Sequence, residues 1–124
     1  MADAAAGPSP SPPAQIVAEF RQAIGESNVL TEPEDVIPYG FDGTAALKQR
    51  PFAVVLPANT AEVAACVKIC DRHGLPVHAR GSGTGLSGGS VPSAGGVVIA
   101  LTRMDRVLEL DPANLTITVE SGLV

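Results

Sequence analysis

Residues 79–90 read Ala79-Arg80-Gly81-Ser82-Gly83-Thr84-Gly85-Leu86-Ser87-Gly88-Gly89-Ser90. Five of these residues are Gly, so the backbone here can adopt positive φ and can approach a ligand closely. Exposed backbone N–H groups, the Ser and Thr hydroxyls and the positive charge of Arg80 are all groups that bind anions. The composition of residues 81–90, which we call the Gly-rich loop, therefore predicts a binding site for a phosphate or a pyrophosphate.

A flexible linker is the alternative, because Gly- and Ser-rich segments commonly serve as linkers. The Gly-rich loop, however, lies between a short apolar run at residues 75–79 and a buried-strand pattern at residues 97–101. Ordered loops on rigid scaffolds often carry function. The position between two core strands favours the ligand-binding interpretation.

Two familiar phosphate-binding motifs do not fit this loop. Gly83-x-Gly85-x-x-Gly88 matches the dinucleotide fingerprint, but that motif needs a helix directly after its third Gly, and residues 88–96 are poor helix formers. Asp105 stands where a ribose-binding acid would be sought, but the crossover helix of a Rossmann unit is missing before it. A Walker A motif would need Lys where Gly89 stands. We therefore expect a loop that binds phosphate through backbone N–H groups and hydroxyls, without a helix dipole.

Four motifs and their joint spacing resemble those of a known family; they lie at residues 57–63, 75–89, 102–106 and 119–122. The chain resembles the FAD-linked oxidases with a PCMH-type, vanillyl-alcohol-oxidase-like FAD-binding domain. Within them it is most like the branch of glycolate oxidase large subunits and D-lactate dehydrogenases. The resemblance covers about residues 33–124. It implies an α+β fold with an α/β-like start: an N-terminal βαβ subdomain followed by a hairpin, truncated before the domain is complete.

The same resemblance implies that the cofactor is FAD. Some relatives attach FAD through a His in this loop, but residues 82–85 occupy that place here, so we expect non-covalent binding. The N–H groups of residues 81–85 and the hydroxyls of Ser82 and Thr84 would hold the pyrophosphate. The full set of expected cofactor contacts is Pro57, Arg80, Gly81, Ser82, Gly83, Thr84, Gly85, Leu86, Ser87, Gly88, Gly89, Glu120 and Gly122.

The chain divides into a disordered lead at residues 1–13, an N-terminal helix and loop lead-in at 14–50, and an incomplete FAD-binding domain at 51–124. An apolar stripe predicts a helix that begins at Ala14, ends at Gly25 and packs outside the flavin core; it consists of Ile16, Val17, Phe20, Ala23 and Ile24. Residues 28–50 are expected to be mainly loop with short extended pieces. Tyr39 could approach the cofactor, although a structural aromatic is favoured.

The remaining elements follow from local patterns. Residues 52–56 predict a strand buried on both faces. A helix capped by Asn59 or Thr60 and ended by Gly74 follows, and its expected inner face is Val63, Cys66, Val67 and Cys70. Residues 107–110 and 115–120 predict a hairpin with one solvated face.

The resemblance implies a flavin-dependent oxidoreductase that oxidises a small 2-hydroxy acid of the glycolate or D-lactate type, with partner subunits of an oxidase complex. The substrate domain of such a protein is absent from this sequence, so no residue is expected to be catalytic or to bind metal, and the piece alone is expected to be inactive. Two alternatives are a non-catalytic nucleotide-binding module and a truncated product without function.

Composition limits the other classes of function. The net charge is −5 and no basic stripe is present, which disfavours nucleic-acid binding. No apolar run approaches the roughly 18 residues of a membrane span, and no secretory signal is recognisable. Cys66 and Cys70 could be half a metal site, but no ligand partner has suitable spacing, so a buried, reduced pair is favoured. We expect a cytoplasmic protein that reaches a membrane only through its partners.

Overall fold

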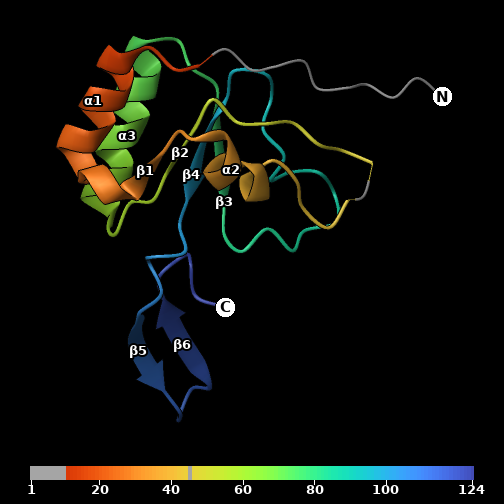
Figure 1. Ribbon diagram of the computed structural model, residues 1–124. Helices are drawn as coiled ribbons and strands as arrows, with labels where there is room; N and C mark the ends of the chain where they lie inside the picture. The colour runs from red at the N-terminus through yellow and green to blue at the C-terminus, as the bar shows by residue number, and fades with distance from the viewer. Residues whose placement is uncertain (1–10, 45) are drawn as a thin grey trace.

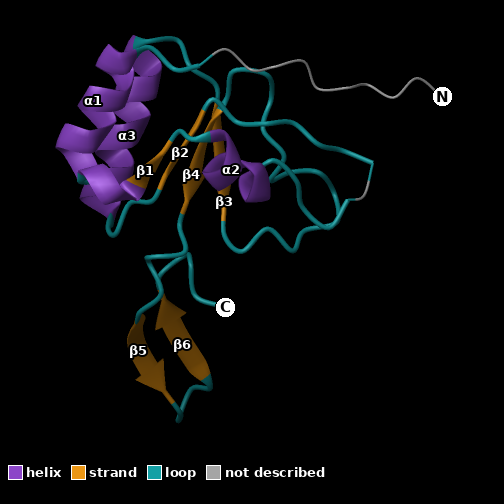
Figure 2. Cartoon of the chain, viewed as in Figure 1, coloured by secondary structure: helices purple, strands orange, loops and turns teal. Residues whose placement is uncertain are grey.

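The computed structural model describes residues 11–44 and 46–124. In this part the chain forms a four-stranded sheet with helices on both faces, and a separate two-stranded hairpin extends away from the sheet (Figures 1 and 2). The elements in chain order are α1 (Ala14–Ile24), η1 (Glu26–Asn28), β1 (Val29–Leu30), α2 (Pro33–Val36), η2 (Ile37–Tyr39), β2 (Ala53–Val55), α3 (Thr60–Arg72), β3 (Val77–Arg80), β4 (Val97–Ala100), β5 (Val107–Asp111) and β6 (Thr116–Val119). The predicted disordered lead lies mostly outside the described residues.

Two packed clusters sandwich the sheet. On one face, α1 and α3 lie side by side and bury Phe20 and Cys66 against Val55 and Ile99. On the other face, α2 and η2 cover Val54 and Val98. Successive residues of a strand point to opposite faces, so β2 and β4 are buried throughout. The prediction of a strand buried on both faces at residues 52–56 is confirmed.

The position of α1 corrects one expectation. The helix has the expected bounds and Gly25 follows it with φ 90°, but its buried side chains belong to the same cluster as β2, β4 and α3. It is therefore part of the core and does not pack outside it. Ala23, expected on the buried stripe, is exposed. The boundary at residue 50 between a lead-in and a domain stays a prediction.

Capping fixes the start of α3. The Asn59 side chain accepts a hydrogen bond from the Glu62 N–H at 3.0 Å, and the Glu62 carboxylate accepts one from the Ala58 N–H at 2.7 Å. The predicted inner face is partly wrong, because Val67 is exposed and Ile69 is buried in its place. Cys66 and Cys70 are free and buried, as expected.

The sheet order is β1-β2-β4-β3, with β1 antiparallel and the other three strands parallel. The strands of the predicted βαβ unit, β2 and β3, are thus parallel but separated by β4. Residues 81–96 join β3 to its parallel neighbour β4 without a helix. The chain between two parallel strands must run from the end of one strand to the start of the next, and most such crossover connections contain a helix. Here the first part of the connection is the Gly-rich loop.

Two further expectations need correction. Residues 28–50 contain α2 and η2 as well as loop, because Pro33 occupies the first turn of α2, where its missing N–H costs nothing. The β5–β6 hairpin forms in the predicted place, but nearly all of its residues are exposed, so both of its faces are open in the described chain.

Candidate functional site

The site lies at the edge of the sheet where the parallel strands end. Pro57 follows β2, Gly81 follows β3 and Leu101 follows β4, so all three lie at the carboxyl edge. The Leu101 N–H donates to the Arg80 carbonyl at 2.9 Å, and Arg103 Nη1 donates to the Leu56 carbonyl at 2.7 Å. These bonds fix the strand ends relative to one another. Open α/β sheets bind their ligands at this edge.

A run of unused hydrogen-bond donors marks the Gly-rich loop. Among the described residues, no backbone or side-chain acceptor takes a hydrogen bond from the backbone N–H groups of residues 81–87. Most side chains of this run are exposed. The loop therefore presents consecutive donors to whatever approaches it, which is what an anion needs.

Arg80 lies at the root of this loop, but its guanidinium is already engaged. The side chain is 8% exposed; Nη1 donates to the Phe41 carbonyl at 3.0 Å and Nη2 to the Ser82 carbonyl at 3.3 Å. Its guanidinium also lies over the ring of Tyr39, which is thus a structural aromatic. A direct contact between Arg80 and the cofactor stays a prediction. The bonds from its guanidinium to Phe41 and Ser82 show that Arg80 helps to shape the loop.

The loop conformation depends on Gly83. Its φ is +78°, and a side chain there would overlap the Arg80 guanidinium. Gly85 differs, because its φ is not positive and the nearest atom to an added Cβ would be Asp42 Oδ2 at 3.9 Å. A side chain at Gly85 would therefore meet neither the backbone strain nor the close neighbour that one at Gly83 would meet.

The middle of the loop rests on residues 42–44. The Gly43 N–H donates to the Gly85 carbonyl at 2.8 Å, and the Thr44 N–H donates to Asp42 Oδ1 at 2.8 Å. The Thr44 N–H is the main cause that lowers the pKa of Asp42, and the Thr44 hydroxyl and the N–H groups of Ser90 and Gly88 add to it. The Asp42 carboxylate is therefore held in its charged form beside the loop.

The far end of the connection is held by His78 in β3. His78 Nε2 accepts a hydrogen bond from the Ser93 N–H at 3.0 Å and lies 3.0 Å from the Ser93 hydroxyl. Both ends of residues 81–96 are thus tied back to β3, and the segment is an ordered loop and not a free linker.

The three expected contacts outside the loop have different surroundings. Pro57 is fully buried at the end of β2. The Gly122 N–H donates to the Met104 carbonyl at 2.8 Å, which places Gly122 beside the turn after β4. Glu120 is paired with Arg106: Oε1 lies 2.6 Å from Nη2 and Oε2 accepts from the Arg106 N–H at 3.0 Å. The Arg106 guanidinium lowers the pKa of Glu120. As cofactor contacts, all three stay predictions.

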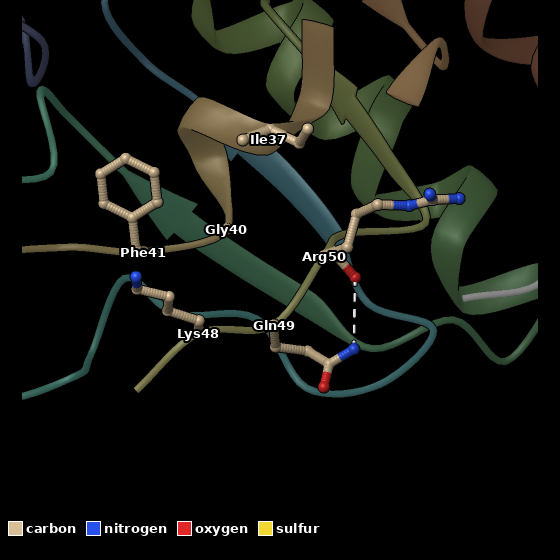
Figure 3. Close-up of a pocket in the computed structure, with 6 residues that line it drawn as sticks. All are labelled: Ile37, Gly40, Phe41, Lys48, Gln49 and Arg50. Carbon is tan, nitrogen blue, oxygen red and sulfur yellow. Dashed lines mark hydrogen bonds between the residues drawn. The ribbon is translucent and has the colours of Figure 1, made fainter. Parts of the chain in front are cut away.

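A small cavity of about 160 Å³ lies next to the site (Figure 3). It is lined by Ile37, Gly40, Phe41, Lys48, Gln49 and Arg50. Phe41 lines this cavity and its carbonyl oxygen accepts from Arg80, so one residue borders both places. None of the expected cofactor contacts lines it.

No cluster of three His, Cys, Asp or Glu side chains that could hold a metal ion occurs within residues 11–44 and 46–124. In the same part of the chain, no helix combines the length and the apolar character needed to cross a membrane.

The comparison with known proteins connects this geometry to a cofactor. Residues 51–124 match the FAD binding domain family, and the Gly-rich loop lies within the matched segment. The chain belongs to this family. As an FAD binding domain it has FAD as its cofactor, which confirms the cofactor expected from the sequence.

The relatives of this FAD binding domain include flavin-linked oxidoreductases. It is 38% identical over 103 residues to glycolate oxidase subunit GlcD of Bacillus subtilis (strain 168) and 43% identical over 111 residues to D-lactate dehydrogenase of Anaerostipes hadrus. These matches cover 83% and 89% of this chain. The chain spans only 22% and 23% of the two relatives.

Solved structures confirm the fold class. p-Cresol methylhydroxylase superposes with a TM-score of 0.78 at 28% identity, covering 88% of this chain and 22% of that one. Alkyldihydroxyacetonephosphate synthase gives a TM-score of 0.79 at 21% identity, covering 92% and 23%. The predicted PCMH-type fold is therefore confirmed, with only part of the domain present in these residues.

The sequence did not reveal the residues that hold the loop. Asp42, Gly43 and Ser93 were not singled out, and His78 was assigned no role in the loop. The contact between His78 and Ser93 joins residues 15 positions apart, and the bond between Gly43 and Gly85 joins residues still farther apart. Contacts over such separations leave no local pattern in the sequence.

Proposed function

We propose that residues 81–87 bind the pyrophosphate of FAD, and that the chain is the cofactor-holding part of a flavin-dependent oxidoreductase that oxidises a small 2-hydroxy acid. The observation that carries the proposal is the run of unpartnered N–H donors on a loop that is tied to the sheet at both ends. Family membership supports FAD as the ligand. The names of the relatives, glycolate oxidase subunit and D-lactate dehydrogenase, support a 2-hydroxy acid as the substrate.

The chemistry divides between cofactor and protein. Bound FAD would supply the hydride acceptor, since redox chemistry belongs to the flavin. The residues of this chain would bind and orient: N–H groups of the Gly-rich loop against phosphate oxygens, with the Ser82 and Thr84 hydroxyls as further donors. No residue here forms a covalent link to the flavin in this proposal.

The number of donors is sufficient for useful affinity. A hydrogen bond to a charged group contributes about 1.5 to 3 kcal/mol. Three to five such bonds sum to about 5 to 15 kcal/mol. The translational and rotational cost of association is subtracted from this sum, whereas an ordered loop avoids the further cost of ordering on binding. Affinity should depend strongly on the phosphates and less on the flavin ring.

Titration with three flavins tests the binding part. FAD, FMN and riboflavin would be titrated into the full-length protein and into the 124-residue chain, with ADP as competitor, and flavin fluorescence would be followed. We expect the order FAD, then FMN, then riboflavin, and displacement of FAD by ADP. Equal affinity for riboflavin and FAD, or failure of ADP to compete, would falsify the assignment of the loop to the pyrophosphate.

Anaerobic reduction tests the substrate part separately. The flavin-loaded full-length protein would be mixed with glycolate, D-lactate and L-lactate in turn. Loss of the flavin absorbance at about 450 nm would be recorded as the measure of flavin reduction. Bleaching by glycolate or D-lactate supports the proposal. A loaded protein that none of them bleaches keeps the binding assignment but loses the substrate assignment.

Partners and location are part of the same proposal. The name "glycolate oxidase subunit" of one relative supports an assembly with further subunits. We propose a cytoplasmic protein that works in such an assembly and reaches a membrane only through it. Gel filtration of the native complex and fractionation of cells would test this; a protein that migrates as a lone chain would argue against the assembly.

A further inference from the structure

Two segments far apart in the sequence meet at the candidate site. Residues 39–44 contact residues 80–90 through the Arg80 bond to Phe41, the ring contact of Tyr39 and the Gly43 bond to Gly85. Asp42 lies in the middle of this contact and is only 9% exposed. A charged side chain so deeply buried needs compensation from its neighbours.

Backbone donors supply that compensation. Asp42 Oδ1 accepts from the Thr44 N–H at 2.8 Å. The N–H groups of Gly88 and Ser90 contribute to the lowered pKa of Asp42, after the larger effect of Thr44. Oδ2 is buried without a close hydrogen-bond partner among the described residues, and it faces Gly85. The carboxylate therefore lies against the second half of the Gly-rich loop, from Gly85 to Ser90.

We infer that Asp42 is a positioning residue that fixes the Gly-rich loop in its cofactor-binding form before FAD arrives. The expected effect on FAD affinity rests on the proposed function. The order of the Gly-rich loop, in contrast, is a property of the cofactor-free protein. A carboxylate repels a pyrophosphate, so the two must occupy different sides of the loop. Asp42 thus also defines the side on which the dinucleotide cannot bind.

The geometry explains why a carboxylate is needed. Asn at this position would keep the shape, but it would place either an amide NH₂ group or a neutral oxygen against the backbone N–H groups, and neutral acceptors bind them less strongly. The Gly-rich loop would then lose one of its anchors while the sheet beneath it kept all of its contacts. Loss of preorganisation lowers affinity for a ligand that needs the ordered form.

The test compares Asp42→Asn with Asp35→Asn in the full-length protein. Asp35 is exposed on α2, so Asp35→Asn makes the same chemical change outside the site. Hydrogen exchange of the cofactor-free protein would report two sets of amides separately: the loop amides of Gly88 and Ser90, whose N–H groups act on the Asp42 carboxylate, and those of β4. FAD and riboflavin would be titrated in parallel. For Asp42→Asn we expect loop amides that exchange about tenfold faster, unchanged β4 amides, an FAD Kd raised about tenfold and an unchanged riboflavin Kd. Asp35→Asn should match the wild type in every measurement.

A second variant disturbs the contact between residues 42–44 and the Gly-rich loop without changing any charge. A Cβ on Gly43 would lie 2.8 Å from the Gly85 carbonyl oxygen and 2.7 Å from Leu86 Cδ2. Gly43→Ala should therefore push the loop away and reproduce the exchange and affinity pattern of Asp42→Asn. Agreement between the two variants would assign the effect to the position of the loop and not to the lost charge.

Three results would overturn the inference. Unchanged loop exchange in Asp42→Asn would show that Asp42 does not order the loop. Equal loss of protection in the loop and in β4 would make Asp42 a general stabilising residue. Tighter FAD binding with unchanged exchange would place Asp42 beside the cofactor itself. If the wild type binds no FAD, the proposed function fails, and the exchange measurement still decides the inference.

Discussion

The guanidinium carbon of Arg80 lies 5.3 Å from the centre of the Tyr39 ring. The same guanidinium donates to the carbonyls of Phe41 and Ser82, so it joins the end of β3 to the segment after η2. The sequence thus makes Arg80 look like a charged ligand-binding residue, whereas in the structure it is a buried cation with structural contacts. This contact leads to the first prediction.

Replacing Arg80 by Ala removes two hydrogen bonds from a charged donor and a ring contact. We expect the free energy of unfolding of the chain, measured by urea denaturation, to fall by about 2 to 4 kcal/mol. Arg72→Ala is the matched control, because Arg72 is 62% exposed and pairs with Glu19 at the surface; it should cost no more than about 1 kcal/mol. Equal costs for the two variants would contradict the structural role of Arg80.

Gly83→Ala should prevent FAD retention. Its φ of +78° is costly for Ala, and the new methyl group would displace the Arg80 guanidinium. We expect an FAD Kd at least about tenfold higher, measured by flavin fluorescence. Gly74→Ala, with φ +63° and open space around it, carries the same backbone strain outside the site and should leave the Kd unchanged. A Gly83→Ala protein that keeps its flavin would refute the loop geometry.

The two buried thiols should make the protein less stable in alkali. Burial raises the pKa of Cys66 from 9.0 to about 12 and that of Cys70 to about 11. Because unfolded thiols ionise near pH 9 and folded ones do not, this stability is complete below pH 9 and declines as the pH rises towards 11 to 12. Urea denaturation at several pH values should show the decline, and the double variant Cys66→Ala/Cys70→Ala should show a flatter profile. An identical slope would contradict the raised pKa values.

Local signals explain what the sequence could predict. The strand β2, the Asn59 cap and the helix-ending residues Gly25 and Gly74 follow from short-range patterns, and the structure confirms them. The family resemblance supplied the fold class and FAD. The inner face of α3 was partly wrong because Val67 and Ile69 both border the apolar stripe, and only packing against α1 and the sheet decides between them.

Long-range contacts explain what it could not predict. The bond between Gly43 and Gly85, and the position of the Asp42 carboxylate next to Gly85, bring together segments with no shared motif. The helical residues of α2 lie between Pro33 and Pro38, where two prolines suggest a loop. Burial of Val36 beneath the sheet outweighs that weak local preference.

The exposed hairpin should govern the solubility of the 124-residue chain. Leu110 of β5 pairs in register with Ile117 of β6, and they are 65% and 55% exposed. Leu110→Lys should change the free energy of unfolding by no more than about 0.5 kcal/mol and should reduce self-association in sedimentation experiments. Ile99→Ala in β4, where Ile99 is 2% exposed, should instead cost about 2 to 5 kcal/mol. A large loss of stability in Leu110→Lys would show that the hairpin packs against the sheet.

The central place of β4 has a consequence for how this protein is made. Within the described residues, β2 and β3 each bond to β4 and not to each other. A nascent chain on the ribosome that has reached residue 96 therefore holds β2 and β3 without the strand that lies between them. The sheet closes only after the Gly-rich loop has been synthesised and has carried the chain back along β3. The Gly-rich loop therefore serves the core as well as the cofactor, because residues 81–96 must be long enough to bring β4 back between β2 and β3.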